Sequence, residues 1–130
     1  MRASDCCDFP TYASNLVLTI PESGNTVPDL LDEVRWNLDW MLAMQTENGG
    51  VYSKLTPLLF DGFIMPNKST ARRYVFMKTT PAALDFAAVM AMSSRLYRKY
   101  DAPFADRCIE AAKKAYAWAV DSPSVRYVQP

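Results

Sequence analysis

A turn followed at once by a helix with two apolar sides, between Pro21 and Gln45, constrains the fold of this chain more than any other segment. The turn is the Pro-Glu-Ser-Gly-Asn cluster at residues 21–25. Pro28 suits the first turn of a helix, where its missing N–H leaves no hydrogen bond unmade, and the acidic residues after it face the positive end of the helix dipole. The pattern predicts a helix from about Pro28 to Gln45.

At about 100° per residue, the apolar residues of this helix fall on two ridges. The first ridge is Leu30, Val34, Leu38 and Met41, and the second is Trp36, Trp40 and Met44. Two apolar ridges need neighbours on two sides, as a helix in a two-ring helical barrel would have. We therefore expect both sides of this helix to be covered.

The middle of the chain predicts a short antiparallel β-ladder. Gly49 and Gly50 end the first helix, because glycine readily adopts the left-handed conformation of a helix C-cap. Residues 51–56 and 73–78 then alternate between apolar and polar side chains, as strands do, and the segment between them reads as a loop.

Two further helices follow the ladder. Thr80 as N-cap and Pro81 as first helical residue predict a helix from about Pro81 to Tyr100, apolar nearly all round in its first three turns. Two or three residues near Asp101 separate it from a third helix of about Pro103 to Val120, so these two helices should lie antiparallel. The apolar stripe of the third helix is Phe104, Cys108, Ala111, Ala112, Ala115 and Ala119. The predicted fold is mainly α.

Composition limits the classes of partner. The chain has 130 residues, half of them apolar, which is enough for one core. Its net charge is zero and it has no run of five or six like charges, which argues against nucleic acid or an anionic membrane surface as the main partner. No apolar run reaches the roughly 18 residues that span a bilayer, and the first ten residues lack the apolar region of a secretory signal.

The cysteines and the absence of histidine argue against a metal site or a cofactor. Cys6, Cys7 and Cys108 match no zinc spacing and are expected to be free thiols, with Cys108 in the core. The sequence has no histidine, so it lacks the commonest metal ligand and the commonest general base. We expect no metal and no cofactor.

Several separate motifs resemble one family, glycoside hydrolase family 9, the inverting endoglucanases and related cellulases. The motifs are the Ile-Pro-Glu-Ser-Gly-Asn and Pro-Asp-Leu-Leu-Asp-Glu-x-Arg-Trp run over residues 20–36, Gly49-Gly50-Val51-Tyr52, Met65-Pro66, Arg73-Tyr74-Val75-Phe76, and the run from Asp85 to Ala91. The resemblance implies a partial (α/α) six-hairpin barrel. Residues 20–130 would be an internal piece of its catalytic domain, and residues 1–19 a leading segment.

The resemblance also implies a reaction that needs two carboxyl groups about 6.5–9.5 Å apart, one as acid and one as base. The family takes its base from an Asp-Ala-Gly-Asp motif upstream of the Ile-Pro-Glu-Ser run, and its acid from a glutamate near the end of the catalytic domain. Neither motif occurs in this chain. We expect no catalytic residue here and no glucan hydrolysis by the chain alone; the parent enzyme is expected to be secreted or periplasmic.

Tyr52, Ser53 and Lys54 are the candidate substrate-binding residues. Family members commonly read Gly-Gly-Val-Tyr-His-Lys at this point, with the histidine in the glucan cleft, whereas this chain has Ser53 in its place. A serine still offers a hydrogen bond to a sugar hydroxyl, but it lacks the reach and the flat face of imidazole. Tyr52 and Lys54 also fit structural roles.

Other polar and aromatic residues have a structural and a functional interpretation. Helix-dipole interactions explain Asp29, Asp32 and Glu33, and Asp85 is expected to hydrogen-bond backbone or tyrosine hydroxyls in the core. Tryptophan rings can stack on pyranose rings, but helical spacing favours core packing; the tryptophans are Trp36, Trp40 and Trp118.

The expected partner is the remainder of the catalytic barrel or another copy of this chain. The uncovered apolar sides of the first two helices favour self-association, because exposed patches of several hundred Å² are uncommon on monomers. A helical module that binds β-glucan without cutting it is a further alternative.

Overall fold

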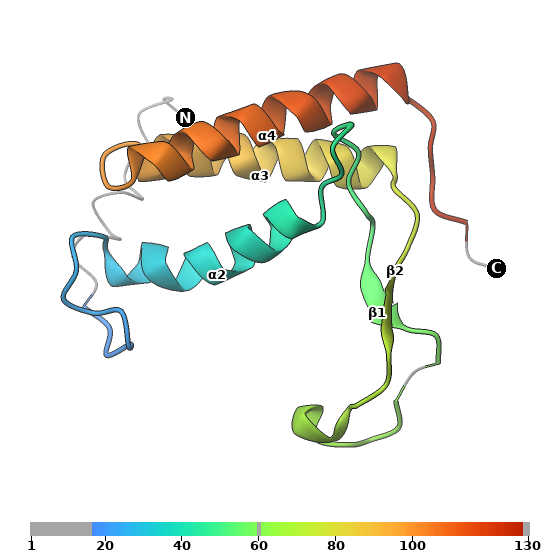
Figure 1. Cartoon of the computed structure of the whole chain (residues 1–130), viewed down its shortest axis with the longest axis horizontal. Helices are drawn as coiled ribbons and strands as arrows, with labels where there is room; N and C mark the ends of the chain where they lie inside the picture. The colour runs from blue at the N-terminus through green and yellow to red at the C-terminus, as the bar shows by residue number, and fades with distance from the viewer. Residues whose placement is uncertain (1–16, 60, 129–130) are drawn as a thin grey trace, which may run out of the picture.

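The computed structural model describes residues 17–59 and 61–128 (Figure 1). In chain order its elements are α2 (Asp29–Ala43), β1 (Leu55–Pro57), the 3-10 helix η2 (Pro66–Lys68), β2 (Arg73–Val75), α3 (Thr80–Tyr97) and α4 (Ala102–Asp121). The α3 and α4 helices lie side by side, α2 lies along the same pair, and the two strands project away from the helices (Figure 1). The prediction of three helices with a short antiparallel ladder between the first and the second is confirmed.

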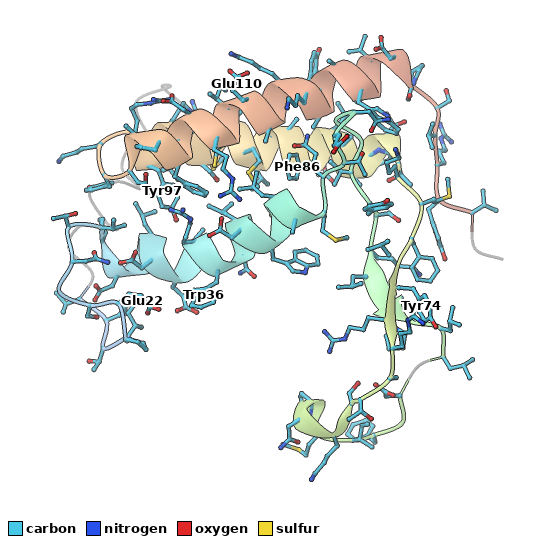
Figure 2. The ribbon with its side chains drawn as sticks, in the orientation of Figure 1. Glu22, Trp36, Tyr74, Phe86, Tyr97 and Glu110 are labelled. Atoms are coloured by element: carbon cyan, nitrogen blue, oxygen red, sulfur yellow. The ribbon has the colours of Figure 1, made fainter. Side chains whose placement is uncertain are left out.

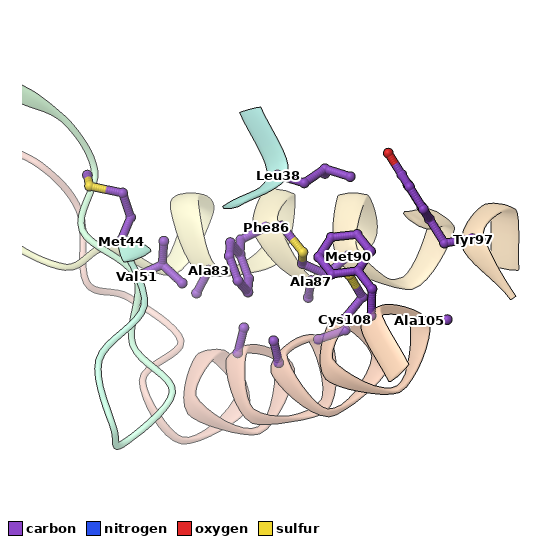
Figure 3. Close-up of a cluster of buried hydrophobic side chains, with 14 of the residues drawn as sticks. Leu38, Met44, Val51, Ala83, Phe86, Ala87, Met90, Tyr97, Ala105 and Cys108 are labelled. Carbon is purple, nitrogen blue, oxygen red and sulfur yellow. The ribbon is translucent and has the colours of Figure 1, made fainter. Parts of the chain in front are cut away.

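The core is the seam between α3 and α4. The two helices run antiparallel: at one end the Tyr97 ring packs edge-on against Phe104 with centroids 4.9 Å apart, and at the other Thr80 bonds to Ser122. Figure 3 shows Phe86 and Met90 of α3 between the two helices. The α4 residues of the seam are small and buried: Ala105, Cys108, Ala111, Ala112, Ala115 and Ala119. The predicted apolar stripe of the third helix is thus confirmed.

The α2 helix presents one face to this pair. Leu31 and Leu38 are buried, and the Tyr97 hydroxyl donates a hydrogen bond to the Leu31 carbonyl. Arg35, between them, forms ion pairs with Asp39 (2.9 Å) and with Asp101 (3.0 Å). Its guanidinium carbon lies 3.3 Å from the centroid of the Phe104 ring. A cation held by two carboxylates and an aromatic face joins α2 to the turn that links α3 and α4.

The expectation that both apolar ridges of α2 are covered is wrong for the described structure. Val34 of the first ridge is 38% exposed, and on the second ridge Trp36 is 68% and Trp40 51% exposed. Figure 2 shows Trp36 on the side of α2 away from α3 and α4. The buried face contains Leu31, Arg35 and Leu38 instead, because four- and three-residue steps return to one side of a helix. Core packing of Trp36 and Trp40 is therefore also wrong here.

The turn before α2 is tied to the start of that helix. Asp29 is buried, and its carboxylate accepts hydrogen bonds from the Leu18 N–H (2.8 Å) and the Ser23 hydroxyl (2.9 Å). Asn25 donates to the carboxylate of Asp32 (2.9 Å). These acids therefore bind specific donors of the turn in addition to lying at the positive end of the helix dipole.

The ladder pairs Leu55 with Val75 and Pro57 with Arg73. Hydrogen bonds continue in the same register beyond the strands, from the Phe76 N–H to the Lys54 carbonyl (2.9 Å) and from the Ser53 N–H to the Met77 carbonyl (3.1 Å). Pairing therefore covers the two predicted strand segments, although regular strand geometry is limited to three residues each.

The start of α3 differs by one residue from the prediction. Thr79, not Thr80, is the N-cap, and its hydroxyl accepts a hydrogen bond from the Ala82 N–H at 3.3 Å. Thr80 exchanges hydrogen bonds with Val125: its N–H donates to the Val125 carbonyl (2.9 Å), and its hydroxyl accepts from the Val125 N–H (3.0 Å). The two consecutive threonines therefore have different roles: Thr79 caps α3, and Thr80 binds the segment after α4.

Cys108 is a buried free thiol, as predicted, and burial raises its pKa. Cys6 and Cys7 lie outside the described residues. Among residues 17–59 and 61–128, no helix combines the length and the apolar character needed to cross a bilayer.

The first prediction concerns Asp101, which caps α4 by accepting the Phe104 N–H at 3.0 Å and also pairs with Arg35. Asp101→Ala should lower the free energy of unfolding by about 1–2 kcal/mol, because both interactions are lost. Asp101→Asn should cost less, since asparagine caps equally well. Urea denaturation at neutral pH measures both; equal losses would contradict the capping role.

The same carboxyl predicts a pH dependence. The Phe104 N–H and then Arg35 hold the pKa of Asp101 below its usual value. Its stabilising effect is therefore present above the unfolded pKa of about 4 and is lost as the pH falls through the lower folded value. When the pH is lowered from 5 to 3, the free energy of unfolding should therefore fall more for wild type than for Asp101→Asn, and urea denaturation at the two pH values measures this.

Candidate functional site

The candidate residues lie in residues 51–54, and the chain directly before them, residues 45–50, is attached to α4. Gly49 has φ +92°, and a Cβ added there would lie 2.3 Å from the Lys114 carbonyl oxygen. The Gln45 side chain donates to the carbonyls of Gly49 (3.2 Å) and Ala111 (2.9 Å). Gly50 is also closely packed, because a Cβ there would lie 2.7 Å from Cδ of Lys78 and 2.9 Å from Cε2 of Trp118. Position 49 therefore requires glycine both for its left-handed conformation and for the close approach to α4.

Hydrogen bonds on two sides then fix the backbone of residues 51–53. The Tyr52 N–H donates to the Met44 carbonyl at the end of α2 (3.1 Å), and Tyr52 also bridges to Lys78. The Thr79 N–H donates to the Val51 carbonyl at 3.3 Å. The segment is therefore held between the end of α2 and the start of α3, so its side chains are presented from a rigid backbone.

A pocket of about 160 Å³ lies where these three parts meet. Its lining is mainly apolar: Trp40, Met41, Met44, Val51, Tyr52, Ser53, Ala82, Asp85 and Phe86. Figure 3 shows Met44, Val51 and Phe86 at this end of the core. We call this space the α2–α3 pocket.

Ser53 and Asp85, two polar residues of the α2–α3 pocket, differ in burial. The Ser53 hydroxyl oxygen is buried and makes no hydrogen bond within the described part of the chain. Asp85 is exposed rather than buried in the core, so the prediction that it hydrogen-bonds there is wrong. The reason is its place on α3, where Ala83, Phe86 and Ala87 take the buried face and turn Asp85 to the side.

The three candidate substrate-binding residues have different surroundings. Tyr52 and Ser53 line the α2–α3 pocket. The Lys54 ammonium instead lies 4.5 Å from the centroid of the Phe76 ring and 4.6 Å from that of Tyr127. These two rings meet edge to face at 6.3 Å. The contact between Lys54 and Phe76 could have been predicted from the strand register, because the two residues lie opposite each other in the ladder.

The three tryptophans also have different surroundings. Trp40 lines the α2–α3 pocket, Trp118 packs against the core next to Gly50, and Trp36 faces away from both. Of the three, Trp40 alone combines a place in the pocket with an exposed ring.

The pocket does not hold a pair of carboxyl groups, since Asp85 is the one acidic residue of its lining. Within residues 17–59 and 61–128, no cluster of three or more histidine, cysteine or carboxylate side chains could hold a metal ion. The described arrangement offers hydrogen-bonding groups and aromatic faces rather than an acid and a base.

Comparison with known proteins assigns the family. The sequence model of glycosyl hydrolase family 9 matches residues 10–130. A xyloglucan-specific endo-β-1,4-glucanase from Bacteroides ovatus is 54% identical over 125 residues, which cover 93% of this chain. The chain belongs to glycosyl hydrolase family 9. Endoglucanase D from Acetivibrio thermocellus is 39% identical over 118 residues, or 89% of the chain.

Solved structures of the family share the fold. A family 9 structure from Bacteroides ovatus superposes with a TM-score of 0.87 at 54% identity, covering 93% of this chain and 23% of that one. A metagenome-derived family 9 endoglucanase gives 0.80 at 42% identity, covering 87% and 20%. The chain spans about a fifth of the length of the curated relatives, 21% and 19% for the two named above. It is therefore a partial piece of the (α/α)6 barrel that these relatives form.

A glycine comparison tests how the segment is held. Gly49→Ala should be strongly destabilising, by about 3 kcal/mol or more, because a left-handed backbone and a clash with the Lys114 carbonyl act together. Gly24→Ala is the matched control, since Gly24 has φ +97° but open space around its Cβ, and should cost only about 1 kcal/mol. Thermal unfolding of both variants measures the difference; equal losses would refute the close approach to α4.

Proposed function

We propose that this chain is part of the catalytic barrel of an inverting β-1,4-glucan hydrolase, in which it supplies scaffold and a glucan contact rather than the acid or the base. The observation that carries this proposal is the superposition of 93% of the chain on a family 9 structure at a TM-score of 0.87. A piece that keeps this conformation can take the same place in a longer barrel. The single carboxylate in the α2–α3 pocket fits a supporting role, because inversion needs two.

Tyr52 and Ser53 are the proposed glucan contacts. Both side chains line the α2–α3 pocket, and the Ser53 hydroxyl oxygen is buried in the isolated chain without a hydrogen-bond partner among the described residues. Lys54 was predicted alongside them from the family motif; its contact with Phe76 and Tyr127 supports a role in holding the segment to the ladder instead. The specificity named for the Bacteroides ovatus relative makes xyloglucan the first substrate to test. We also propose that the longer protein acts outside the cytoplasm, where polymeric glucan is found.

A chimera tests the activity. The matched segment of the Bacteroides ovatus glucanase is replaced by this chain, and reducing ends released from xyloglucan and from carboxymethylcellulose are measured. We expect the chimera to hydrolyse glucan and the purified 130-residue chain to release none. Turnover by the chain alone would overturn the supporting role, and a folded chimera without any activity would overturn the proposed place in the barrel.

Within the same chimera, Ser53→Ala should raise the KM for glucan with little change in kcat, because it removes a contact shared by the bound substrate and the transition state. Ser69→Ala is the matched control, since Ser69 lies in the exposed loop between the strands and bonds to Asp61 there. An unchanged KM in Ser53→Ala would remove Ser53 from the glucan contacts.

Self-association of the isolated chain is the second candidate, and a specific surface favours it. An apolar groove of about 430 Å³ lies between α3 and α4, lined by Leu84, Ala87, Ala88, Ala91, Ile109, Ala112, Lys113 and Tyr116. Leu84 is 43% exposed and Tyr116 60% exposed. We propose that a second copy covers this groove when the rest of the barrel is absent.

Light scattering at micromolar concentration should therefore give a mass above that of one chain. Leu84→Glu should shift the chain toward the monomer, because it places a charge in the groove. Leu59→Glu is the matched control, since Leu59 is 82% exposed but lies in the loop after β1. A monomeric wild type, or an equal shift with both variants, would contradict the proposal.

A further inference from the structure

The α2–α3 pocket is open at its outer side and closed at its inner side. Met44, Val51 and Phe86 line it and are buried, so they form its floor (Figure 3). Trp40 and Asp85 also line it and are exposed, so they form its rim. A ligand that enters from solvent therefore reaches a floor and cannot run through to another opening.

The size of the pocket limits what can enter. Its volume of about 160 Å³ is below the roughly 300–1,000 Å³ of pockets for drug-sized ligands, so it has room for a single sugar ring. A sugar within a β-1,4-glucan main chain is bonded at both ends and needs a groove that is open in two directions. A branch sugar or a chain end is bonded only once, so either can enter a pocket with a closed floor.

The chemistry of the lining suits a sugar without a hydroxymethyl group. The polar side chains are those of Tyr52, Ser53 and Asp85, and the rest of the lining is apolar. The Ser53 hydroxyl oxygen is buried without a partner among the described residues, so a sugar hydroxyl would satisfy it. A terminal xylosyl group lacks the hydroxymethyl group of glucose. It therefore sets less polar surface against the apolar floor, while its ring hydroxyls can bind the three polar side chains.

Trp40 supplies a flat face at the rim, on which the C–H side of a sugar ring can pack. Resting on the proposed function, we propose that the α2–α3 pocket binds a xylosyl branch of a xyloglucan main chain. The branch ring packs on Trp40, and one of its hydroxyls donates a hydrogen bond to the Asp85 carboxylate. The glucan contact proposed for Tyr52 and Ser53 is then a contact with the branch.

This assignment makes the pocket a determinant of specificity. An unbranched glucan leaves the pocket to water, so contacts inside it favour the branched substrate alone and appear as a difference in kcat/KM between the two substrates. A chain end is the competing occupant. It is present in branched and unbranched substrates alike, so its loss would affect both equally.

Oligosaccharides of equal main-chain length test the assignment in the Bacteroides ovatus chimera. The measurement is the ratio of kcat/KM for a xylosylated cello-oligosaccharide to kcat/KM for the unbranched one. Trp40→Ala should lower this ratio about tenfold, because it removes the packing face for the branch. Trp40→Phe should keep most of the ratio, since phenylalanine retains a flat ring. Asp85→Ala should lower it as well, because the acceptor for the branch hydroxyl is lost.

Trp36→Ala is the matched control. Trp36 lies one turn earlier on α2, is more exposed than Trp40 and lines no part of the pocket, so its removal should leave the ratio unchanged. An unchanged ratio in Trp40→Ala, or an equal fall in Trp36→Ala, would overturn the branch pocket. In an active chimera, either result leaves the proposed function intact.

The isolated chain provides a second measurement that does not depend on the chimera, because its own described residues form the pocket. In an NMR titration, the Trp40 indole N–H signal should shift more with methyl α-xylopyranoside than with methyl β-cellobioside at equal concentration. An equal or smaller shift would overturn the branch pocket. A folded chimera without activity would overturn the proposed function, and the titration would still decide whether the pocket prefers the xylosyl group.

Discussion

Close packing of small side chains between α3 and α4 is the constraint on which the rest of the structure depends. Alanines and Cys108 on α4 let the two helices approach, so Phe86 and Met90 of α3 can fill the seam (Figure 3). Two neighbouring segments are attached to this pair: the Gln45 side chain bonds to the Ala111 carbonyl of α4, and Thr80 of α3 binds the segment after α4. A larger residue in the seam would therefore disturb attachments that it does not touch.

The candidate site depends on α3 and α4 indirectly, through the backbone that these two helices hold in place. Gly49 lies against the Lys114 carbonyl, and Thr79 at the start of α3 donates its N–H to the Val51 carbonyl, so α4 and α3 together set the position of Tyr52 and Ser53. Arg35 has the corresponding role for α2, because its ion pair with Asp101 and its contact with Phe104 hold that helix against the turn between α3 and α4, and Asp39 of the same helix also pairs with it. The pocket between α2 and α3 exists because these two attachments fix its walls.

Local patterns predicted the elements well and the side-chain environments less well. The stripe of α4 and the strand segments follow from periodicity, which depends only on near neighbours along the chain. The orientation of α2 depends on Tyr97 and Asp101, more than sixty positions away, so its sequence showed two ridges but not which face is buried. The sequence also did not determine the burial of Asp85, since an acid within an apolar helix gives the same pattern whether its side chain faces a core or an open pocket. Adjacent threonines at 79 and 80 both suit an N-cap, and only the hydrogen bonds with Val125 distinguish them.

The short connection between α3 and α4 also bears on how the chain folds. The residues that meet across the seam near Asp101, such as Tyr97 and Phe104, are close in sequence, so this hairpin forms without closing a long loop. Chains rich in such local contacts fold fast. The α2 helix is attached through Tyr97 and Asp101, which both lie at the end of α3 beside the turn, so its attachment depends on this end of the hairpin. In native-state hydrogen exchange, the seam amides of α4 would then open last and those of α2 earlier, at a lower free energy.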